Sequence, residues 1–467
     1  MSAVELKVAV CAICRNERPY VEEWISYYQT IGFDGVYIYD NESDDGTSEL
    51  LTALDAIGEI KRVHWPRKEG IPPQRDAYGH FLNNFAHRYD YVLVCDLDEF
   101  LVIDGGGVKE LIGSAEALHQ EVGAIALPWL VFGSGGQEVE LPGLVIDRFK
   151  LCDKSVARSV KTLYSTRNTY NMRTHICDLL NGAYLDNELA IAQWDQKMPI
   201  KLKKPTAGKA RIHHYYTKSR EEWLKRRAQP KADRAKIELK KIQEFDKYSA
   251  FVTVNDQASL YSDKVIERIA AIRKKVSEAQ ANADRARIDL ISVNSEWLFG
   301  VVHDLPCESA VVRISGDAAE AFARCTRISE RTHLFTYKNK WRNTYRQSLA
   351  VSIVGSSRST RFTAAEYPSP IQSLRALSKF MRSAEEHIFS YALLALSETD
   401  ISETLDICRS LAFSKNKKFA SFFISLSAYS CTKEVSAFLS ELEGEDEDFK
   451  KMIFDPKKSP YLSNLKS

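Results

Sequence analysis

The sequence predicts an α/β protein whose N-terminal part is a mostly parallel sheet covered by helices on both faces. Short apolar runs alternate with amphipathic stretches of about ten to fifteen residues, the pattern of strands joined by crossover helices. The runs are continuously apolar, as expected of parallel strands buried on both faces. Polar clusters follow the runs that end at Ile13, Tyr39 and Cys95. Open sheets of this kind bind ligands at the carboxyl ends of their strands, so these clusters mark the candidate site.

The individual elements follow from apolar spacing and from the residues that begin and end helices. In the first helix, Val21, Trp24 and Tyr28 recur at helical spacing. Pro19 precedes these residues and Gly32 follows them, as is usual at the two ends of a helix. We expect strands at 7–13, 36–39, 60–64 and 91–95, and helices at 19–31, 47–56 and 73–88.

The remainder of the chain changes character twice. Between residues 197 and 241 there are 16 Lys and Arg against 4 Asp and Glu, and an amphipathic helix is expected at 263–286. Short alternating apolar runs then predict a small β-rich unit at 287–365. Helical patterns predict a helical unit at 366–467. We therefore expect three parts, of which the first covers residues 1–286 and includes the helix at its end.

The composition excludes some classes of protein. The 467 residues include 64 Lys and Arg against 63 Asp and Glu, whereas a dedicated nucleic-acid binder carries a basic excess. Nine cysteines, an odd number without the spacing of a disulfide framework, favour a reducing compartment. Cys11 and Cys14 lie in one expected strand, where residues three apart point to opposite faces. We therefore expect two buried thiols and no shared zinc ion.

Asp96-Leu97-Asp98 directly follows the expected strand at 91–95 and is the most informative motif. Two carboxylates at the end of a strand can turn toward one divalent cation, and oxygen ligands favour Mg²⁺ or Mn²⁺. Such a cation binds the diphosphate of a nucleotide-sugar and neutralises the charge that develops on the leaving group. The simpler alternative is a loop of solvated acidic side chains.

Several motifs together resemble glycosyltransferases of the GT-A fold, in particular family 92 and its bacterial relatives similar to family 2. The motifs occur in the family's order over roughly residues 7–230 and are far more specific jointly than singly, whereas residues 287–467 carry no such resemblance. They are Cys14-Arg15-Asn16-Glu17, Gly32-Phe33, Tyr39-Asp40-Asn41-Glu42-Ser43-Asp44-Asp45-Gly46, Gln74-Arg75-Asp76-Ala77-Tyr78, Asp96-Leu97-Asp98-Glu99-Phe100, Trp129-Leu130-Val131-Phe132-Gly133-Ser134-Gly135 and Ile212-His213-His214-Tyr215-Tyr216-Thr217-Lys218-Ser219.

The resemblance implies roles for individual residues. The residues expected to bind the nucleotide-sugar donor are Arg15, Asn16, Glu17, Asp40, Gln74, Arg75 and Asp96. The expected metal ligands are Asp96, Asp98 and His213, with His214 as the alternative. Only one of two adjacent residues in an extended segment can face the site. The residues expected to bind the acceptor are Trp129, Phe132, Gly133, Ser134 and His175.

The catalytic base stays open at this level. The resemblance favours inversion, and an inverting transferase needs a side chain that takes the proton of the acceptor hydroxyl. Glu138, Asp147, Asp178 and Glu188 are all candidates by position, and the sequence does not choose among them.

The expected function is metal-dependent transfer of a sugar from a nucleotide-sugar to a hydroxyl of a glycan or glycolipid. The resemblance favours a UDP-sugar, with UDP-galactose as one candidate, and Mn²⁺ or Mg²⁺ as the cofactor. A sugar nucleotidyltransferase is the first alternative, but it normally carries a glycine-rich loop after the first strand, and residues 14–19 contain no glycine. A non-catalytic carbohydrate-binding protein is the second, and it would not need the carboxylates and the late histidines together.

The sequence also indicates a location. The first residues lack a basic region followed by an apolar stretch, and no apolar run approaches the roughly 20 residues of a membrane helix. We expect a cytoplasmic protein whose basic segment at 197–241 contacts the inner membrane, since each Lys or Arg near an anionic surface contributes about 1 kcal/mol. No nucleic-acid partner is expected, and oligomerisation stays open.

Overall fold

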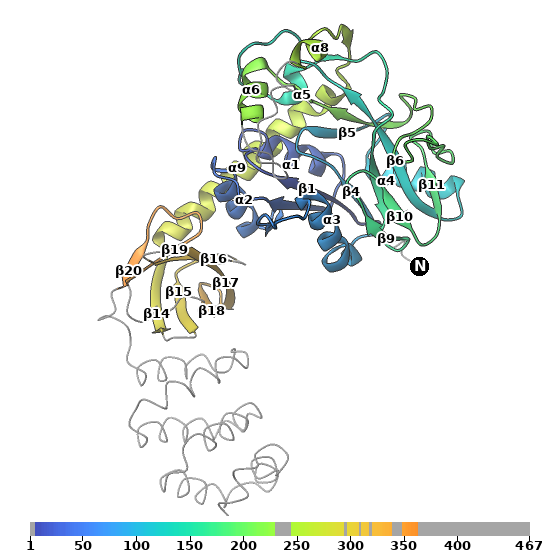
Figure 1. Cartoon of the computed structure of the whole chain (residues 1–467). Coiled ribbons are helices and arrows are strands. Elements are labelled where there is room, and N and C mark those ends of the chain that lie inside the picture. The colour runs from blue at the N-terminus through green and yellow to red at the C-terminus, as the bar shows by residue number, and fades with distance from the viewer. Residues whose placement is uncertain are drawn as a thin grey trace, which may run out of the picture. The chain divides into compact units, whose positions relative to one another are not determined.

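The structure is a computed structural model that describes residues 5–228, 244–293, 297–307, 310–316, 320–338 and 348–362. The chain divides into two compact units between Ser277 and Glu278 (Figure 1). The helical unit expected at 366–467 lies outside the described residues.

The N-terminal unit is built on one nine-stranded sheet. In spatial order its strands are β3 (Lys61–His64), β2 (Gly35–Asp40), β1 (Val8–Cys14), β4 (Tyr91–Val94), β8 (Val160–Ser165), β6 (Val122–Val131), β12 (Ala210–His214) and β5 (Glu99–Ile103), and β11 (Ala183–Leu185) pairs with β6 beside this path. Strands β3, β2, β1 and β4 are parallel to one another. Strand β8 is antiparallel to both β4 and β6, and β12 is parallel to β6 but antiparallel to β5. The sheet is therefore mostly parallel, as predicted.

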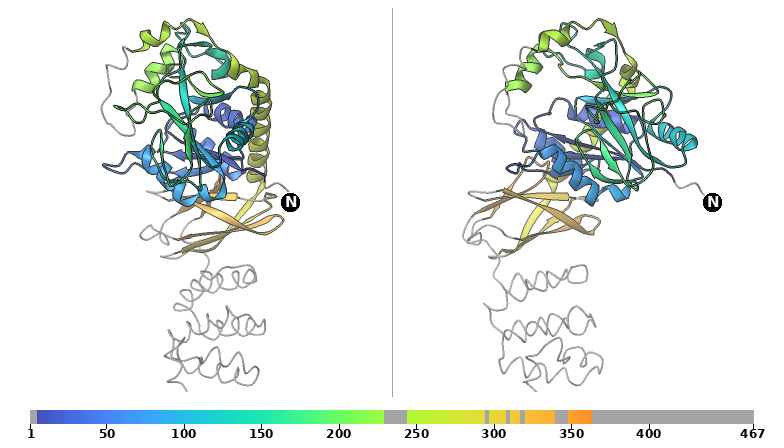
Figure 2. Two further views of the ribbon diagram at one scale, coloured as in Figure 1. Left: turned by 90° about the vertical axis from the view of Figure 1, so that its right-hand side faces the viewer. Right: turned by 45° about the vertical axis from the view of Figure 1, so that its right-hand side comes forward.

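Helices cover both faces of this sheet and separate two hydrophobic cores. The helices that contribute to the larger core are α1 (Val21–Thr30), α2 (Thr47–Ala56), α4 (Val108–Leu118) and the N-terminal part of α9 (Ser262–Arg285). Helix α3 (Pro73–Asn84) packs into the second core, and a short 3₁₀ helix, η1 (Ala86–Arg88), follows it. Helix α9 runs along one side of the N-terminal unit (Figure 2). The predicted arrangement of helices on both faces is confirmed.

Strand β1 shows how the alternation of side chains supplies both cores. Val8, Val10 and Cys14 belong to the larger core, whereas Ala9 and Cys11 belong to the core under α3. Both thiols are buried, as expected, and the two cysteines belong to different cores.

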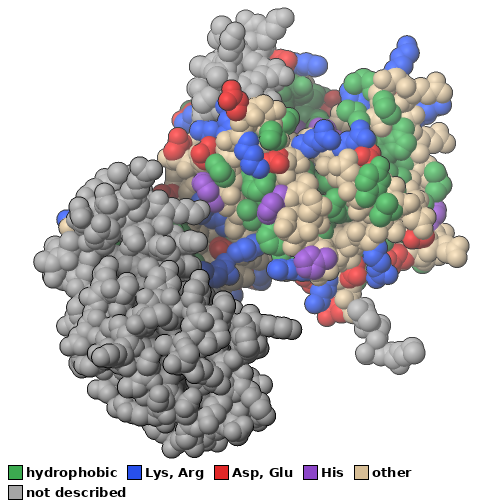
Figure 3. Space-filling model, turned by 60° about the horizontal axis from the view of Figure 1, so that its bottom comes forward, with side chains coloured by type: hydrophobic (Ala, Val, Ile, Leu, Met, Phe, Trp, Pro, Cys, Tyr) green, Lys and Arg blue, Asp and Glu red, His purple; other side chains and the backbone are tan. Residues whose placement is uncertain are grey.

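Shorter elements complete the N-terminal unit around the sheet. They are α5 (Val145–Arg148), β7 (Leu151–Cys152), β9 (Thr169–Met172), β10 (Cys177–Leu179), α6 (Arg220–Ala228), α8 (Phe245–Ser249), β13 (Thr253–Val254) and η2 (Gln257–Tyr261). Basic, acidic and apolar side chains are interspersed on the face of this unit seen in Figure 3. No helix in the described part of the chain has the length and apolar character needed to cross a membrane.

The C-terminal unit contains a seven-stranded antiparallel sheet, so the expected β-rich unit is present. Its strands in spatial order are β14 (Arg287–Val293), β15 (Trp297–His303), β18 (Thr332–Lys338), β17 (Glu320–Ser329), β16 (Ala310–Ser315), β19 (Leu349–Ile353) and β20 (Thr360–Phe362). Buried and partly buried residues alternate along β16 and β19, which is the pattern of a sheet packed on one face.

Candidate functional site

A cavity of about 860 Å³ opens at the carboxyl ends of β1 and β4. Its walls come from the loops after β1, β2 and β4, the N-terminus of α3, strand β6, and the segment from β12 into α6. The lining residues include Arg15, Asn16, Glu17, Asn41, Gln74, Asp96, Asp98, Trp129, Glu140, His175, His214, Lys218, Glu222, Lys225 and Arg226. The site thus lies where an open parallel sheet binds ligands.

The two aspartates lie in the tight connection between β4, which ends at Val94, and β5, which begins at Glu99. The side chain of Asp96 is 33% exposed. Its Oδ1 accepts a hydrogen bond from Nε2 of Gln74 at 2.6 Å, and its Oδ2 lies 3.0 Å from Nζ of Lys161. Both carboxylate oxygens of Asp96 therefore have a partner within the protein.

Asp98 is buried and faces two groups on later segments of the chain. Its Oδ2 lies 3.4 Å from Nε2 of His214 and accepts a hydrogen bond from the guanidinium of Arg226. Burial alone would raise the pKa of Asp98, but the charge of Arg226 and the contact with His214 outweigh it and hold the pKa well below its usual range. Asp98 is therefore an anion at neutral pH.

Strand pairing decides which of the two adjacent histidines faces the cavity. Strand β12 pairs with β5 so that His214 lies opposite Glu99. Its ring packs on Trp129 and it lines the cavity. His213 points to the other face, where it is fully buried against Phe132. The preference for His213 as the metal ligand is therefore wrong in geometry, and the alternative His214 is the one placed beside Asp98.

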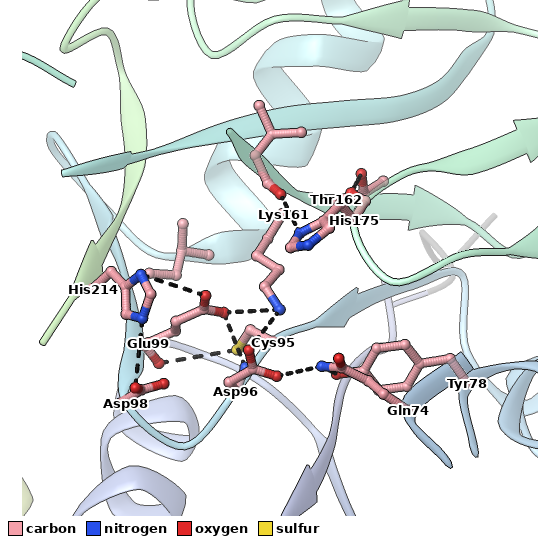
Figure 4. A network of polar contacts seen from close by, with 12 residues as sticks. Gln74, Tyr78, Cys95, Asp96, Asp98, Glu99, Lys161, Thr162, His175 and His214 are labelled. Carbon is pink, nitrogen blue, oxygen red and sulfur yellow. Dashed lines mark hydrogen bonds and ion pairs between the residues drawn. The ribbon is translucent and has the colours of Figure 1, made fainter. Parts of the chain in front are cut away.

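A buried lysine, absent from the sequence prediction, connects these groups (Figure 4). Lys161 on β8 is fully buried, and its Nζ lies 3.0 Å from Asp96 and 3.3 Å from Oε2 of Glu99. Burial would lower the pKa of this amine, but attraction to Asp96 and Glu99 raises it well above the usual value, so Lys161 carries its charge. The sequence does place this lysine within the mostly apolar run Val160–Tyr164, which could have indicated a buried charged side chain.

Nothing in the described part of the chain forms a cluster of three or more His, Cys, Asp or Glu side chains with the geometry of a metal site. Two side chains of these types, Asp98 and His214, both line the cavity, and their atoms Oδ2 and Nε2 lie 3.4 Å apart. Mg²⁺ is commonly held by one or two carboxylates together with substrate phosphates. The residues present therefore fit a cation shared with a diphosphate better than a preformed cage.

The chain was compared with known protein families. Residues 5–131, which carry strands β1 to β4 and both aspartates, match the model of glycosyltransferase family 92. This region is similar to glycosyltransferase family 92.

Two family 92 proteins of plants illustrate the extent of this likeness. A family 92 protein of Oryza sativa subsp. japonica is 28% identical over 131 residues, which is 28% of this chain and 22% of that protein. A family 92 protein of Arabidopsis thaliana is 32% identical over 100 residues, which is 21% of this chain and 17% of that protein. The match thus spans about a fifth of the length of these relatives.

Among solved structures, S. aureus TarS 1-349 shares 14% identity over 34% of this chain and 47% of its own, with a TM-score of 0.22. S. aureus TarS shares 9% identity over 77% of both chains, with a TM-score of 0.24. The α/β architecture of the N-terminal unit is therefore taken from the strand order given above and not from these two structures.

Most of the residues expected to bind the donor line this cavity. They are Arg15, Asn16, Glu17, Gln74 and Asp96. Asp40 does not line it, because its carboxylate is fully buried and accepts hydrogen bonds from Ser48 and Arg62. Those bonds overcome the effect of burial and lower the pKa of Asp40, which makes it a structural anion under the loop. Asn41, the next residue, reaches the cavity instead.

Arg75 also lies outside this cavity, although it follows Gln74 directly. It lines a separate cleft of about 560 Å³ on the outer side of α3. Successive residues of a helix are separated by about 100° around its axis, so Gln74 and Arg75 point in different directions.

Of the residues expected to bind the acceptor, some line the cavity and others do not. Trp129 and His175 line the cavity and pack against each other with ring centroids 5.5 Å apart. Phe132 is fully buried, and Ser134 is buried with its hydroxyl bonded to Ser249. Gly133 packs so closely on α8 that an added Cβ would lie 2.0 Å from the carbonyl oxygen of Tyr248. Phe132, Gly133 and Ser134 are therefore packed inside the protein and do not line the cavity, contrary to their expected role in binding the acceptor.

None of the four candidate bases lines the cavity, and each has a local role. Glu138 pairs with Arg220, Asp147 accepts from Ser262, Asp178 pairs with Arg173, and Glu188 accepts from Thr206. Glu140, two residues after Glu138, does line the cavity, with its Oε2 3.0 Å from Nζ of Lys225. Glu138 and Glu140 lie in an irregular loop, and the sequence offers no signal for which of them faces the cavity.

Proposed function

We propose that this chain is a metal-dependent glycosyltransferase that moves a sugar from a nucleotide-sugar, with a UDP-sugar as the favoured donor, to a hydroxyl of a glycan or glycolipid. One observation carries the proposal: Asp98 and His214 converge in a cavity at the carboxyl ends of the strands of a family 92 region. That place and that pair of ligand types suit the charged leaving group of a nucleotide-sugar.

Asp98 and His214 are the residues that would hold Mn²⁺ or Mg²⁺. When bound, the cation supplies charge neutralisation for the departing nucleoside diphosphate. Arg226 and Lys218 lie on the same wall and add positive charge for the phosphate oxygens. Arg15, Asn16 and Gln74, on the opposite side of the motif, suit the nucleotide.

Glu140 is the base that the geometry favours for an inverting transfer. It stands on the loop after β6, the strand that carries Trp129, and its side chain is 32% exposed at the cavity. The carboxylates of Asp96 and Glu222 contact the buried cations Lys161 and Arg148, and Asp98 is assigned to the metal ion, whereas Glu140 contacts Lys225, whose side chain is 58% exposed. A carboxylate in this state can accept the proton of an acceptor hydroxyl.

The first experiment measures Mn²⁺-dependent hydrolysis across a panel of nucleotide-sugars by the purified chain. One donor should be hydrolysed slowly without acceptor, and Asp98→Asn should lower that rate about a thousandfold because several kcal/mol of charge stabilisation are lost. Consumption of a nucleoside triphosphate with a sugar phosphate would instead indicate a nucleotidyltransferase. Hydrolysis that is unaffected by chelator or by Asp98→Asn would refute the metal assignment.

The second experiment tests Glu140 with its neighbour as control. Glu140→Gln should lower kcat for transfer about 10² to 10⁴-fold with little change in donor binding, the usual range for loss of a general base. Glu138→Gln, whose side chain is 64% exposed and pairs with Arg220, should leave transfer unchanged. Equal effects of the two substitutions would remove Glu140 from this role.

A further inference from the structure

The position of Lys161 follows from the register of β8. Val94, the last residue of β4, pairs with Thr162, so Lys161 lies beside the backbone that leaves β4 toward Asp96. On its other side it pairs with Leu127 of β6. A lysine placed inside the sheet in this way cannot reach water, and its amine is fully buried.

The amine of Lys161 binds one carboxylate oxygen of each of two residues. Asp96 Oδ2 lies at 3.0 Å and Glu99 Oε2 at 3.3 Å. Glu99 also accepts a hydrogen bond from the backbone N–H of Asp96 at 2.9 Å. Since Gln74 takes the other oxygen of Asp96, this aspartate is fixed from both sides.

Glu99 connects the same cluster to His214. Its second oxygen lies 4.0 Å from Nδ1 of His214, and neither atom has a hydrogen-bond partner among the described residues (Figure 4). Glu99 therefore lies on the side of the ring away from Asp98, where metal-binding histidines commonly have a carboxylate.

The two aspartates of the motif therefore differ in how firmly their cations are held. Lys161, the partner of Asp96, has an exposed fraction of 0% and is enclosed by β4 and β6. Arg226, the partner of Asp98, is 40% exposed near the C-terminus of α6. A long, half-exposed side chain can leave its carboxylate when a ligand arrives, whereas a buried amine cannot.

We propose that Lys161 is a positioning residue that withholds Asp96 from the metal ion and so limits the protein ligands to Asp98 and His214. An ammonium group and a divalent cation repel each other strongly at the same carboxylate. With two protein ligands the cation depends on diphosphate oxygens, so the free metal binds weakly and the nucleotide binds with it. This inference rests on the proposed metal-dependent function.

The test measures the affinity of the chain for Mn²⁺ alone and in the presence of UDP, by electron paramagnetic resonance of the free ion. Lys161→Met should release Asp96 as a third ligand and tighten binding of Mn²⁺ alone by about tenfold, since affinity follows the number of charged ligands. The gain in affinity caused by UDP should shrink by a similar factor. Adding Asp96→Asn to Lys161→Met should abolish the tightening.

Two further variants separate this effect from loss of stability. Lys161→Met combined with Glu99→Gln removes both charges of the buried pair, so it should fold even where the single variant does not, and it should still bind Mn²⁺ more tightly than the unaltered protein. Arg211→Met removes another buried cation, which binds Asp104 away from the cavity, and should leave the affinity for Mn²⁺ unchanged.

The outcomes distinguish the inference from the proposed function. If the unaltered protein binds Mn²⁺ together with UDP but neither Lys161 variant binds Mn²⁺ alone more tightly, the role of Lys161 is overturned and the function stands. If the unaltered protein binds no Mn²⁺ even with UDP, the proposed metal dependence fails and this inference fails with it.

Discussion

His213 and His214 are adjacent in the chain and lie on opposite faces of β12, so they allow a matched comparison at the residue scale. His214→Ala should lower metal-dependent donor hydrolysis with little change in stability, because the ring lines the cavity. His213→Ala should lower the free energy of unfolding by about 2 to 4 kcal/mol, because it leaves a void against Phe132 and Tyr215. Urea unfolding and a hydrolysis assay on both variants check this; a reversed pattern would mean that the register of β12 is different.

Glu23 provides a pH dependence that can be derived from its surroundings. The carboxylate is buried on α1 and accepts the backbone N–H groups of Val145 and Ile146. Burial raises its pKa from the ordinary 4.5 to about 7, although the two backbone bonds oppose the shift. Between these values the folded state keeps a proton that the unfolded chain has lost, so rising pH removes stability.

The contribution of Glu23 to stability should therefore be present below about pH 4.5 and lost by about pH 7, with a total of at most about 3 kcal/mol. Glu23→Gln should flatten this part of the stability curve. Unfolding in urea at pH 5 and pH 8 measures the difference between the two proteins. An unchanged slope in the variant would show that Glu23 is ionised in the folded state at both values.

At the scale of elements, the packing of the loop after β6 against α8 depends on a missing side chain. Gly133→Ala would place a Cβ 2.0 Å from the carbonyl oxygen of Tyr248, so the loop or the helix must move. We expect a loss of about 2 kcal/mol or more in unfolding free energy. Gly79→Ala in the middle of α3, with open space at its Cβ, should instead stabilise by up to about 1 kcal/mol. Thermal unfolding of both variants tests the contrast.

The first four strands and three helices could be predicted from the sequence because their signals are local. Continuous apolar runs mark β1, β2 and β4, and Thr47 and Pro73 begin α2 and α3 as expected. Strands β5 to β11 were not predicted, since several are short and their partners lie far away in the chain; β8, for example, pairs with β4 and β6. Local patterns do not encode such pairings.

The same limit explains which site residues were found. Arg15, Gln74 and Asp98 follow strands whose ends the sequence reveals, and they line the cavity. The errors at His213 and Asp40 arose from pairings beyond local reach: β12 with β5 in the first case, and the bond from Arg62 in the second.

At the scale of the whole molecule, the described residues that line the cavity all precede position 227 and belong to the N-terminal unit. A chain that ends at residue 286 should therefore keep donor hydrolysis within about twofold, while transfer to the natural acceptor should fall if the later residues select it. Parallel assays of hydrolysis and transfer on both lengths test this. A truncated chain that folds, by circular dichroism, but no longer hydrolyses donor would show that later residues complete the site.

The place of β8 between β4 and β6 has a consequence for biosynthesis. The ribosome completes β4 roughly 66 residues before β8, and at about 5 to 20 residues per second this interval lasts about 3 to 13 seconds. During that time the edge of β4 has no antiparallel partner, and unpaired strand edges promote aggregation. The nascent chain should therefore need its closest chaperone protection while residues 95–160 are being made, and faster translation of that stretch should raise the soluble yield.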